Sequence, residues 1–180
     1  EIYNESKHGI AFSANRNHMA LDKEGDWILG KDYSAAPTCA TCHIGGYMTA
    51  NGIYKGNNHE IGDRISWTLR PVVSSKINLV IYEDGYKEDY PEKRQLPQVG
   101  EEVQTMEKVY ENEKLVSKTV PRRVAEIITW KERRERMKGA CLNCHSETHL
   151  DNFYKQFDEL VVLYNEKLAK PPQAFMDELP

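Results

Sequence analysis

Residues 39–43 read Cys-Ala-Thr-Cys-His and residues 141–145 read Cys-Leu-Asn-Cys-His, and these two pentapeptides decide how the chain folds. We call them the first and the second motif. Together they hold all 4 cysteines of the 180 residues, so none remains for a structural disulfide. In each motif the two cysteines lie on one helical turn, and a histidine follows directly.

This pattern is typical of covalent attachment of a c-type haem. Each thiol takes one vinyl group of the porphyrin, and the histidine becomes the proximal ligand of the iron. Zinc would favour cysteine pairs much closer together along the chain, and a thioredoxin-like dithiol would need a single motif in a βαβ setting. We therefore predict two haem c groups, bound by Cys39, Cys42, His43, Cys141, Cys144 and His145, with His43 and His145 as proximal iron ligands.

The composition narrows the class of protein. Hydrophobic residues make up 39% of the chain, which is low for a self-sufficient globular core, and haem macrocycles would add apolar surface to pack against. The formal net charge is −4. The densest basic segment, residues 131–138, is interrupted by Glu132 and Glu135, so the chain lacks the sustained basic stripe of a nucleic-acid binder.

No stretch is long and apolar enough to cross a membrane, and the sequence starts without a secretion signal. Haem is attached to such motifs on the outer side of the cytoplasmic membrane. We therefore expect a processed chain or an excised segment, located in the periplasm or an equivalent extracytoplasmic compartment.

The predicted fold class is mainly α, with helices and loops wrapped around two haems and little regular sheet. Residues 1 to about 30 have an apolar face typical of a helix, and residues 31–76 read as irregular. A β-hairpin is expected to project near residues 103–120. We expect helix again from Pro121, with Pro171 and Pro172 breaking a long helix and a last short helix running to Pro180. The predicted organisation is a single dihaem unit within a larger multihaem domain, divided into residues 1–76, 77–120 and 121–180.

Four histidines outside the motifs are candidates for the second axial position of each iron, namely His8, His18, His59 and His149. A surface histidine is more often a bystander than a ligand. Methionine is also an axial ligand in some c-type cytochromes, but the 5 methionines read as packing residues. Arg64, Arg70, Arg122 and Arg123 are candidates for pairing with haem propionates, although a solvated surface charge is the commoner role for any one of them.

Several segments around the motifs share a family pattern: Glu-Ser-Lys-His-Gly at residues 5–9, Ala-Pro-Thr at 36–38, Asn-His-Glu at 58–60, Arg-Ile-Ser-Trp-Thr-Leu-Arg-Pro at 64–71, residues 130–137, and Tyr-Asn-Glu-Lys at 164–167. On these segments the chain resembles the octahaem hydroxylamine oxidoreductase family of multihaem cytochromes c. The resemblance implies the C-terminal two-haem portion of an enzyme of nitrogen metabolism. The catalytic haem would lie outside this segment, so no catalytic residue is expected here.

The related pentahaem nitrite reductases share this ending, and the resemblance implies a role for each of these four histidines. His8 would be the distal ligand of the haem at the second motif, and His59 would bind the iron of a haem outside this segment. The distal ligand of the first haem would come from beyond Pro180, which leaves His18 and His149 as bystanders. The implied partners are other haem-bearing segments or subunits, a redox partner cytochrome and a homotrimeric assembly, with no nucleic acid and no membrane span.

The chain also departs from the family. It is far too short for an octahaem enzyme, and neither Tyr154 nor Tyr164 can be assigned to the tyrosine–haem crosslink of hydroxylamine oxidoreductases. Electron transfer within a multihaem oxidoreductase is the leading interpretation. The alternatives are a free-standing periplasmic dihaem carrier and a haem enzyme with an open site at the first haem. Only the first explains both a histidine without a haem and a haem without a second histidine.

Overall fold

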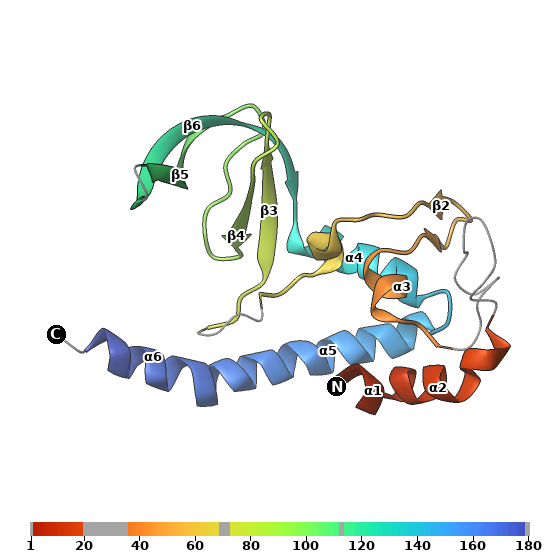
Figure 1. Ribbon diagram of the computed structural model, residues 1–180. Coiled ribbons are helices and arrows are strands. Elements are labelled where there is room, and N and C mark those ends of the chain that lie inside the picture. The colour runs from red at the N-terminus through yellow and green to blue at the C-terminus, as the bar shows by residue number, and fades with distance from the viewer. Residues whose placement is uncertain (1, 20–35, 69–72, 112–113, 179–180) are drawn as a thin grey trace. The chain divides into compact units, whose positions relative to one another are not determined.

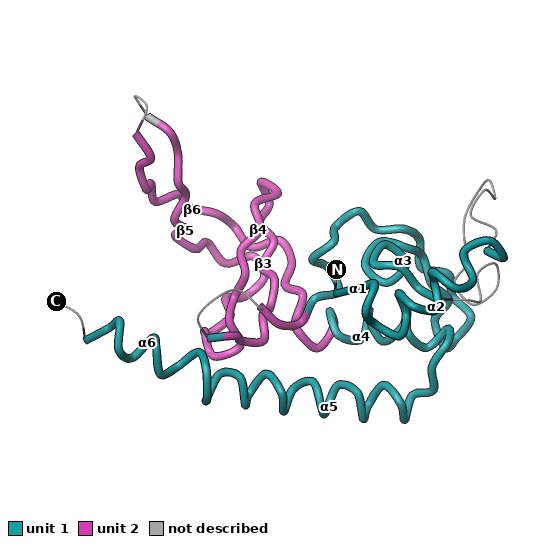
Figure 2. The backbone as a smooth tube through the Cα atoms, turned by 60° about the horizontal axis from the view of Figure 1, so that its bottom comes forward, with its two compact units in different colours: residues 1–65, 71–73, 133–180 teal, residues 66–70, 74–132 magenta. Residues whose placement is uncertain are grey.

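The computed structural model describes residues 2–19, 36–68, 73–111 and 114–178 (Figure 1). The chain divides into two compact units (Figure 2). The first, which we call the motif unit, comprises residues 1–65, 71–73 and 133–180 and contains both motifs. The second, which we call the sheet unit, comprises residues 66–70 and 74–132.

The motif unit begins with two short helices, α1 (Ile2–Glu5) and α2 (Lys7–Asn15), followed by the 3-10 turn η1 (Arg16–His18). Ser6 separates them and caps α2, because its Oγ accepts a hydrogen bond from the Gly9 amide at 3.1 Å. A Cβ atom on Gly9 would lie only 1.9 Å from the Tyr3 carbonyl oxygen, so the close approach of α1 to α2 requires glycine. The predicted N-terminal helix is confirmed in part: residues 2–18 are helical apart from a break at Ser6, and Met19 is not helical. The rest of that prediction lies outside the described residues.

The first motif forms the helix α3 (Cys39–His43). Thr38 caps it in a reciprocal arrangement: its Oγ1 accepts from the Thr41 amide at 3.3 Å, and the Thr41 Oγ1 accepts from the Thr38 amide at 3.0 Å. An irregular segment follows, with the short antiparallel pair β1 (Tyr47–Met48) and β2 (Tyr54–Lys55) and the 3-10 turn η2 (Ile61–Arg64). The threonines on either side of Cys39 thus fix the turn on which both cysteines lie.

The second motif joins α4 (Trp130–Cys141) to α5 (Glu147–Tyr164). The π-helical turn η3 (Asn165–Ala169) and then α6 (Lys170–Asp177) continue directly from α5. The predicted break at Pro171 and Pro172 is therefore wrong, whereas the predicted last short helix is present as α6. Both prolines lie in the first turn of α6, where a backbone N–H is not needed, and the wider π turn before them avoids the usual clash with the preceding carbonyls.

The sheet unit is built on four antiparallel strands, β3 (Ile77–Tyr82), β4 (Lys87–Pro91), β5 (Glu102–Glu111) and β6 (Lys114–Ile128). Their order is β4-β3-β6-β5, and the sheet curls over on itself (Figure 1). Its core consists of Val80, Tyr82, Tyr90 and Val124, all at most 2% exposed. The predicted hairpin is confirmed, since β5 and β6 pair from Glu102↔Arg123 to Glu111↔Lys114.

Two further predictions about this region are wrong. The fold is mixed α/β rather than mainly α with little regular sheet, because β3, β4 and the second half of β6 join the hairpin in one sheet. No helix starts at Pro121, which lies within β6 opposite Gln104. Strand β6 pairs with β3 only from Val124 onward, so Pro121 sits where one side of the strand needs no hydrogen-bond donor. The β-branched Val124, Ile127 and Ile128 favour the strand.

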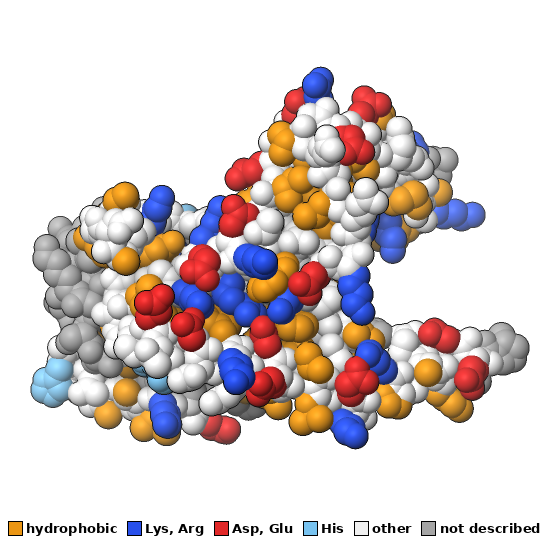
Figure 3. Space-filling view, turned by 180° about the vertical axis from the view of Figure 1, so that it is seen from behind, with side chains coloured by type: hydrophobic (Ala, Val, Ile, Leu, Met, Phe, Trp, Pro, Cys, Tyr) orange, Lys and Arg blue, Asp and Glu red, His pale blue; other side chains and the backbone are white. Residues whose placement is uncertain are grey.

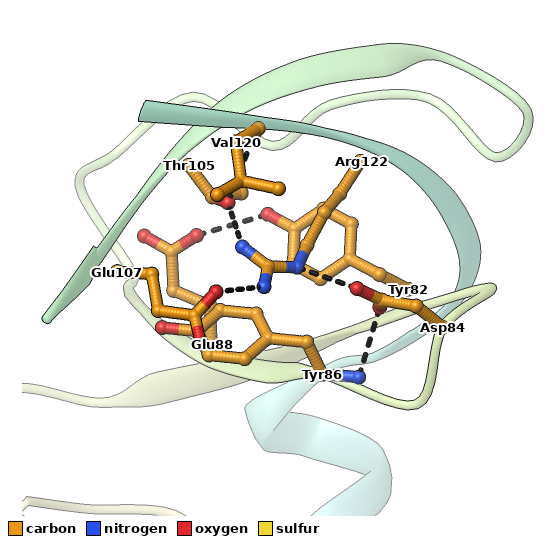
Figure 4. A network of polar contacts seen from close by, with 8 residues as sticks. All are labelled: Tyr82, Asp84, Tyr86, Glu88, Thr105, Glu107, Val120 and Arg122. Atoms are coloured by element: carbon orange, nitrogen blue, oxygen red, sulfur yellow. Dashed lines mark hydrogen bonds and ion pairs between the residues drawn. The ribbon is translucent and has the colours of Figure 1, made fainter. Parts of the chain in front are cut away.

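Arg122 ties the strands of the sheet unit together (Figure 4). Its side chain is 6% exposed. The guanidinium donates to Asp84 at 2.7 Å and to Glu107 at 2.5 Å, and it lies 4.0 Å above the ring of Tyr86. It also donates to the hydroxyl of Thr105. One cation thus links the β3–β4 turn to both strands of the hairpin.

Candidate functional site

In the first motif the cysteine side chains are free of disulfides, and His43 is held by its neighbour in space. The Nδ1 atom of His43 lies 3.3 Å from the Ile61 carbonyl oxygen, a contact in which Nδ1 is the donor when that nitrogen carries the proton. This tautomer leaves Nε2 with its lone pair available to a metal. Arg64 closes the end of α3, donating to the carbonyl oxygens of Cys42 at 2.6 Å and Gly45 at 2.8 Å.

The second motif is held by its own backbone. The His145 amide donates to the Cys141 carbonyl at 2.9 Å, and the Cys144 amide donates to the same oxygen at 3.0 Å. Ser146 then caps α5, since its Oγ accepts from the His149 amide at 3.3 Å. The cysteines thus lie at the end of one helix and His145 lies just before the start of the next.

The two motifs, 102 positions apart at Cys39 and Cys141, are neighbours in the motif unit. The Asn143 Oδ1 accepts from the Met48 amide, and the Asn143 Nδ2 donates to the Met48 carbonyl, both at 3.4 Å. Burial, and to a smaller extent the nearby Cys42, raises the pKa of the Cys141 thiol to about 11. Burial likewise raises the pKa of Cys42, with Cys144 contributing. The four thiols therefore share one region.

Two histidine rings, those of His8 and His149, lie close to the ring of His145 in the second motif. The ring centroids of His8 and His145 are 6.0 Å apart, with the planes tilted by 48°. The rings of His145 and His149 are 4.7 Å apart and nearly parallel, at 15°. Burial lowers the pKa of His145, and His149 and His8 add to this effect. A neutral imidazole is the form that coordinates a metal.

Helices α1 and α2 connect the two motifs. His8 on α2 reaches the second motif, while the Tyr3 hydroxyl on α1 donates to the Pro37 carbonyl at 2.9 Å, just ahead of the first. Burial raises the pKa of Tyr3, and the Cys39 and Cys42 thiols contribute. The N-terminal helices are thus fixed between the residues of both motifs.

These residues fit the demands of covalently bound haem. Each motif supplies two thiols and an imidazole, and metal–nitrogen bonds of about 2.0 Å would place the centroids of two imidazoles on opposite sides of one metal about 6 Å apart. The pair of His8 and His145 meets that separation, whereas the 4.7 Å between His145 and His149 is too short. The Tyr54 hydroxyl beside Gly46 is buried and lacks a hydrogen-bond partner among the described residues. The site defines a c-type cytochrome.

A comparison with protein families agrees with the site. Residues 1–96, more than half of the chain, match the family described as "Seven times multi-haem cytochrome CxxCH". The chain belongs to this family of multihaem cytochromes, and haem is attached covalently through CxxCH motifs to transfer electrons. No curated protein matches the chain, and no solved structure matches it. Such cytochromes typically work outside the cytoplasm, and none of the helices in the described ranges has the length and apolarity to span a bilayer.

The other predicted residues are placed as follows. His59 is exposed in the loop before η2, and His18 is exposed at the end of η1. Arg122 and Arg123 lie in the sheet unit, where Arg122 is fully engaged by Asp84 and Glu107; Arg70 lies outside the described residues. On the face shown in Figure 3, Lys and Arg side chains alternate with Asp and Glu, in agreement with the absence of a basic stripe in the sequence.

Three contacts near the motifs were not predicted from the sequence. Asn143, inside the second motif, bonds to Met48, and the spacing of the motif gives no signal of that contact. Tyr154 lies on α5 near Cys141 and Cys42, which raise its pKa after the larger effect of burial, and the Arg134 guanidinium lies 4.6 Å from its ring. His149, predicted above to be a bystander, has its ring 4.7 Å from that of His145, a contact that was not predicted from the sequence.

Proposed function

We propose that this chain holds two haems, one at each motif, and relays electrons as the C-terminal part of a hydroxylamine oxidoreductase-like multihaem enzyme. The observation that carries this proposal is the 6.0 Å separation of the His8 and His145 rings. When bound, haem iron supplies a one-electron couple, which neither thiols nor imidazoles provide. His8 and His145 would hold that iron from two sides.

The proposed ligands follow from position. His145 and His8 bind opposite sides of the iron at the second motif. His43 is the proximal ligand at the first motif, with its Nδ1 held at Ile61. In the described part of the chain no histidine ring contacts His43, so its distal ligand comes from elsewhere in the protein. His59 is exposed and so is free to bind the iron of a haem outside this segment.

The closeness of the motifs supports a relay. Asn143 and Met48 join the polypeptide on either side, and the thiols of Cys42 and Cys141 lie close enough to influence each other. A histidine without a haem in this segment and a haem without a second histidine are the two open ends expected of a piece of such a relay.

A second candidate function rests on His43. If no other segment supplies its distal ligand, the first haem is open on one side and is a catalytic site rather than a relay. A free-standing periplasmic dihaem carrier is the third candidate, but it accounts neither for the exposed His59 nor for the open side of His43.

The proposed nitrogen substrates, the periplasmic location and the homotrimer rest on the family resemblance. Support for an assembly comes from α5 and α6 with the turn between them, where Phe153, Leu160, Leu168 and Phe175 are each at least 50% exposed. Such a row of apolar side chains is expected to be covered by protein. The partner in that contact would be another segment of the same protein or a second copy of this chain.

The experiment that tests the proposal uses the protein from its native source. The denatured mass of the haem-stained polypeptide is measured, and the reduction of its haems by hydroxylamine is followed by rapid-mixing absorption. We expect a mass several times 20.8 kDa and haem reduction by hydroxylamine. A mass of 20.8 kDa plus two haems, with no reduction by hydroxylamine, would leave a dihaem carrier in its place.

A further inference from the structure

The contact between His145 and His149 belongs to none of the ligand roles assigned above. The two rings stack at 4.7 Å and 15°, and His149 is exposed on its other side. Its distance from His145 excludes it as the ligand on the opposite side of the same iron, because two such imidazoles are about 6 Å apart. A stacked ring on the side of a metal ligand has a different effect: it resists rotation of that ligand.

Both rings are attached to rigid backbone. His145 is fixed by its amide bond to the Cys141 carbonyl at 2.9 Å. His149 is fixed in the first turn of α5, where its amide donates to the Ser146 hydroxyl. With both backbones held by these hydrogen bonds, the main freedom left to the His145 side chain is rotation of its imidazole, and the flat face of His149 opposes that rotation.

We propose that His149 is a positioning residue that sets the plane of the His145 imidazole relative to the His8 imidazole. This inference rests on the proposed function, in which His8 and His145 bind one iron. The angle between the two imidazole planes is 48° in the structure, between parallel and perpendicular. In a ferric low-spin haem this angle determines how the d orbitals of the iron split, so groups around an axial ligand tune the metal without touching it.

Electron paramagnetic resonance of the oxidised, haem-loaded protein tests the proposal, because the g values of a low-spin haem depend on this angle. The signal of the second haem is identified as the one that His8→Ala removes. His149→Ala is expected to shift the g values of that signal alone. His149→Phe keeps a flat ring on His145 and is expected to retain the native g values. Thr148→Ala, on the same exposed turn of α5, is the matched control and should change nothing.

Each outcome has one meaning. An unchanged spectrum in His149→Ala overturns the positioning role while leaving ligation by His8 intact. Equal shifts in His149→Ala and His149→Phe also overturn it, because they would mean that a polar nitrogen rather than the stacked ring acts on His145. If the native protein has no low-spin signal that depends on His8, the ligand assignment fails, and the positioning role fails with it.

Discussion

The side-chain amide of Asn143 forms two hydrogen bonds with the backbone of Met48, accepting from its amide and donating to its carbonyl, at 3.4 Å each. The same Nδ2 donates to the Gly139 carbonyl at 2.8 Å, at the end of α4. Asn143→Ala removes these bonds and leaves backbone groups around the two motifs without partners. We expect a loss of about 1–3 kcal/mol in the free energy of unfolding, measured by denaturant titration of the haem-loaded protein.

The control for this variant is Leu142→Ala at the preceding position, which is 38% exposed. It keeps the amide contacts and should cost less. Equal losses from the two variants would mean that Asn143 does not join the motifs.

Gly9 allows α1 to approach α2 and so places His8. In Gly9→Ala the new methyl group would meet the Tyr3 carbonyl oxygen, and α2 must move away. We expect part of the protein to lose the low-spin absorption of one haem, because His8 follows α2. Ser13→Ala, on an exposed position of the same helix, is the control. A fully low-spin spectrum in Gly9→Ala would show that the position of α2 is not what places His8.

The motifs could be predicted from the sequence because each is set by five consecutive residues. The full sheet could not, because it depends on pairing between strands that are distant in the sequence. Cys39, Cys42 and His43 are fixed by the chemistry of five consecutive residues, and the hairpin at 103–120 alternates clearly. That Pro121 continues a strand depends on which side of β6 faces β3, and this is decided by residues about 40 positions away. Pro171 misled the prediction for a local reason, because a π turn immediately before it lets the helix continue.

Arg122 is the central residue of the sheet unit, and its replacement should destabilise that unit. Arg122→Met keeps much of the side-chain volume but leaves Asp84, Glu107 and Thr105 without their shared donor. We expect a lower melting temperature, measured by calorimetry. Arg123→Met is the matched control, because Arg123 is 62% exposed and lies 3.7 Å from the equally exposed Glu83. A melting temperature no lower than that of the control would refute the role of Arg122.

The apolar row on α5, α6 and the turn between them should be buried in the contact between subunits if the proposed trimer exists. Leu168 is 64% exposed, and Leu168→Glu places a charge where the contact would be dry. We expect the variant to dissociate into smaller species in analytical ultracentrifugation, with the haem spectrum unchanged. Lys167→Glu, at the adjacent exposed position, is the control for added negative charge. Retention of the native size by Leu168→Glu would exclude this row from the contact.

At the site, too, features set by adjacent residues could be predicted from the sequence, and contacts between residues far apart in the sequence could not. The proposed proximal histidines follow from the motifs alone. The proposed pairing of His145 with His8 was implied only by a resemblance, because 137 positions separate the two residues. The structure adds the reason for the Ser-Lys-His-Gly pattern: Ser6 caps the helix, Gly9 permits its close approach and His8 faces His145. Contacts such as that of Asn143 leave no trace in sequence spacing.

The central claim is that His8 and His145 bind opposite sides of one iron, and the most direct test is the spin state of the haems in His8→Ala. The expected result is that one haem changes from low-spin to high-spin absorption, that added imidazole restores it, and that nuclear Overhauser contacts to Leu142 rather than Ala40 identify it as the haem of the second motif. His18→Ala, at an exposed position at the end of η1, should change nothing in the same measurement. A change at the haem of the first motif, or no change at either, would contradict the claim.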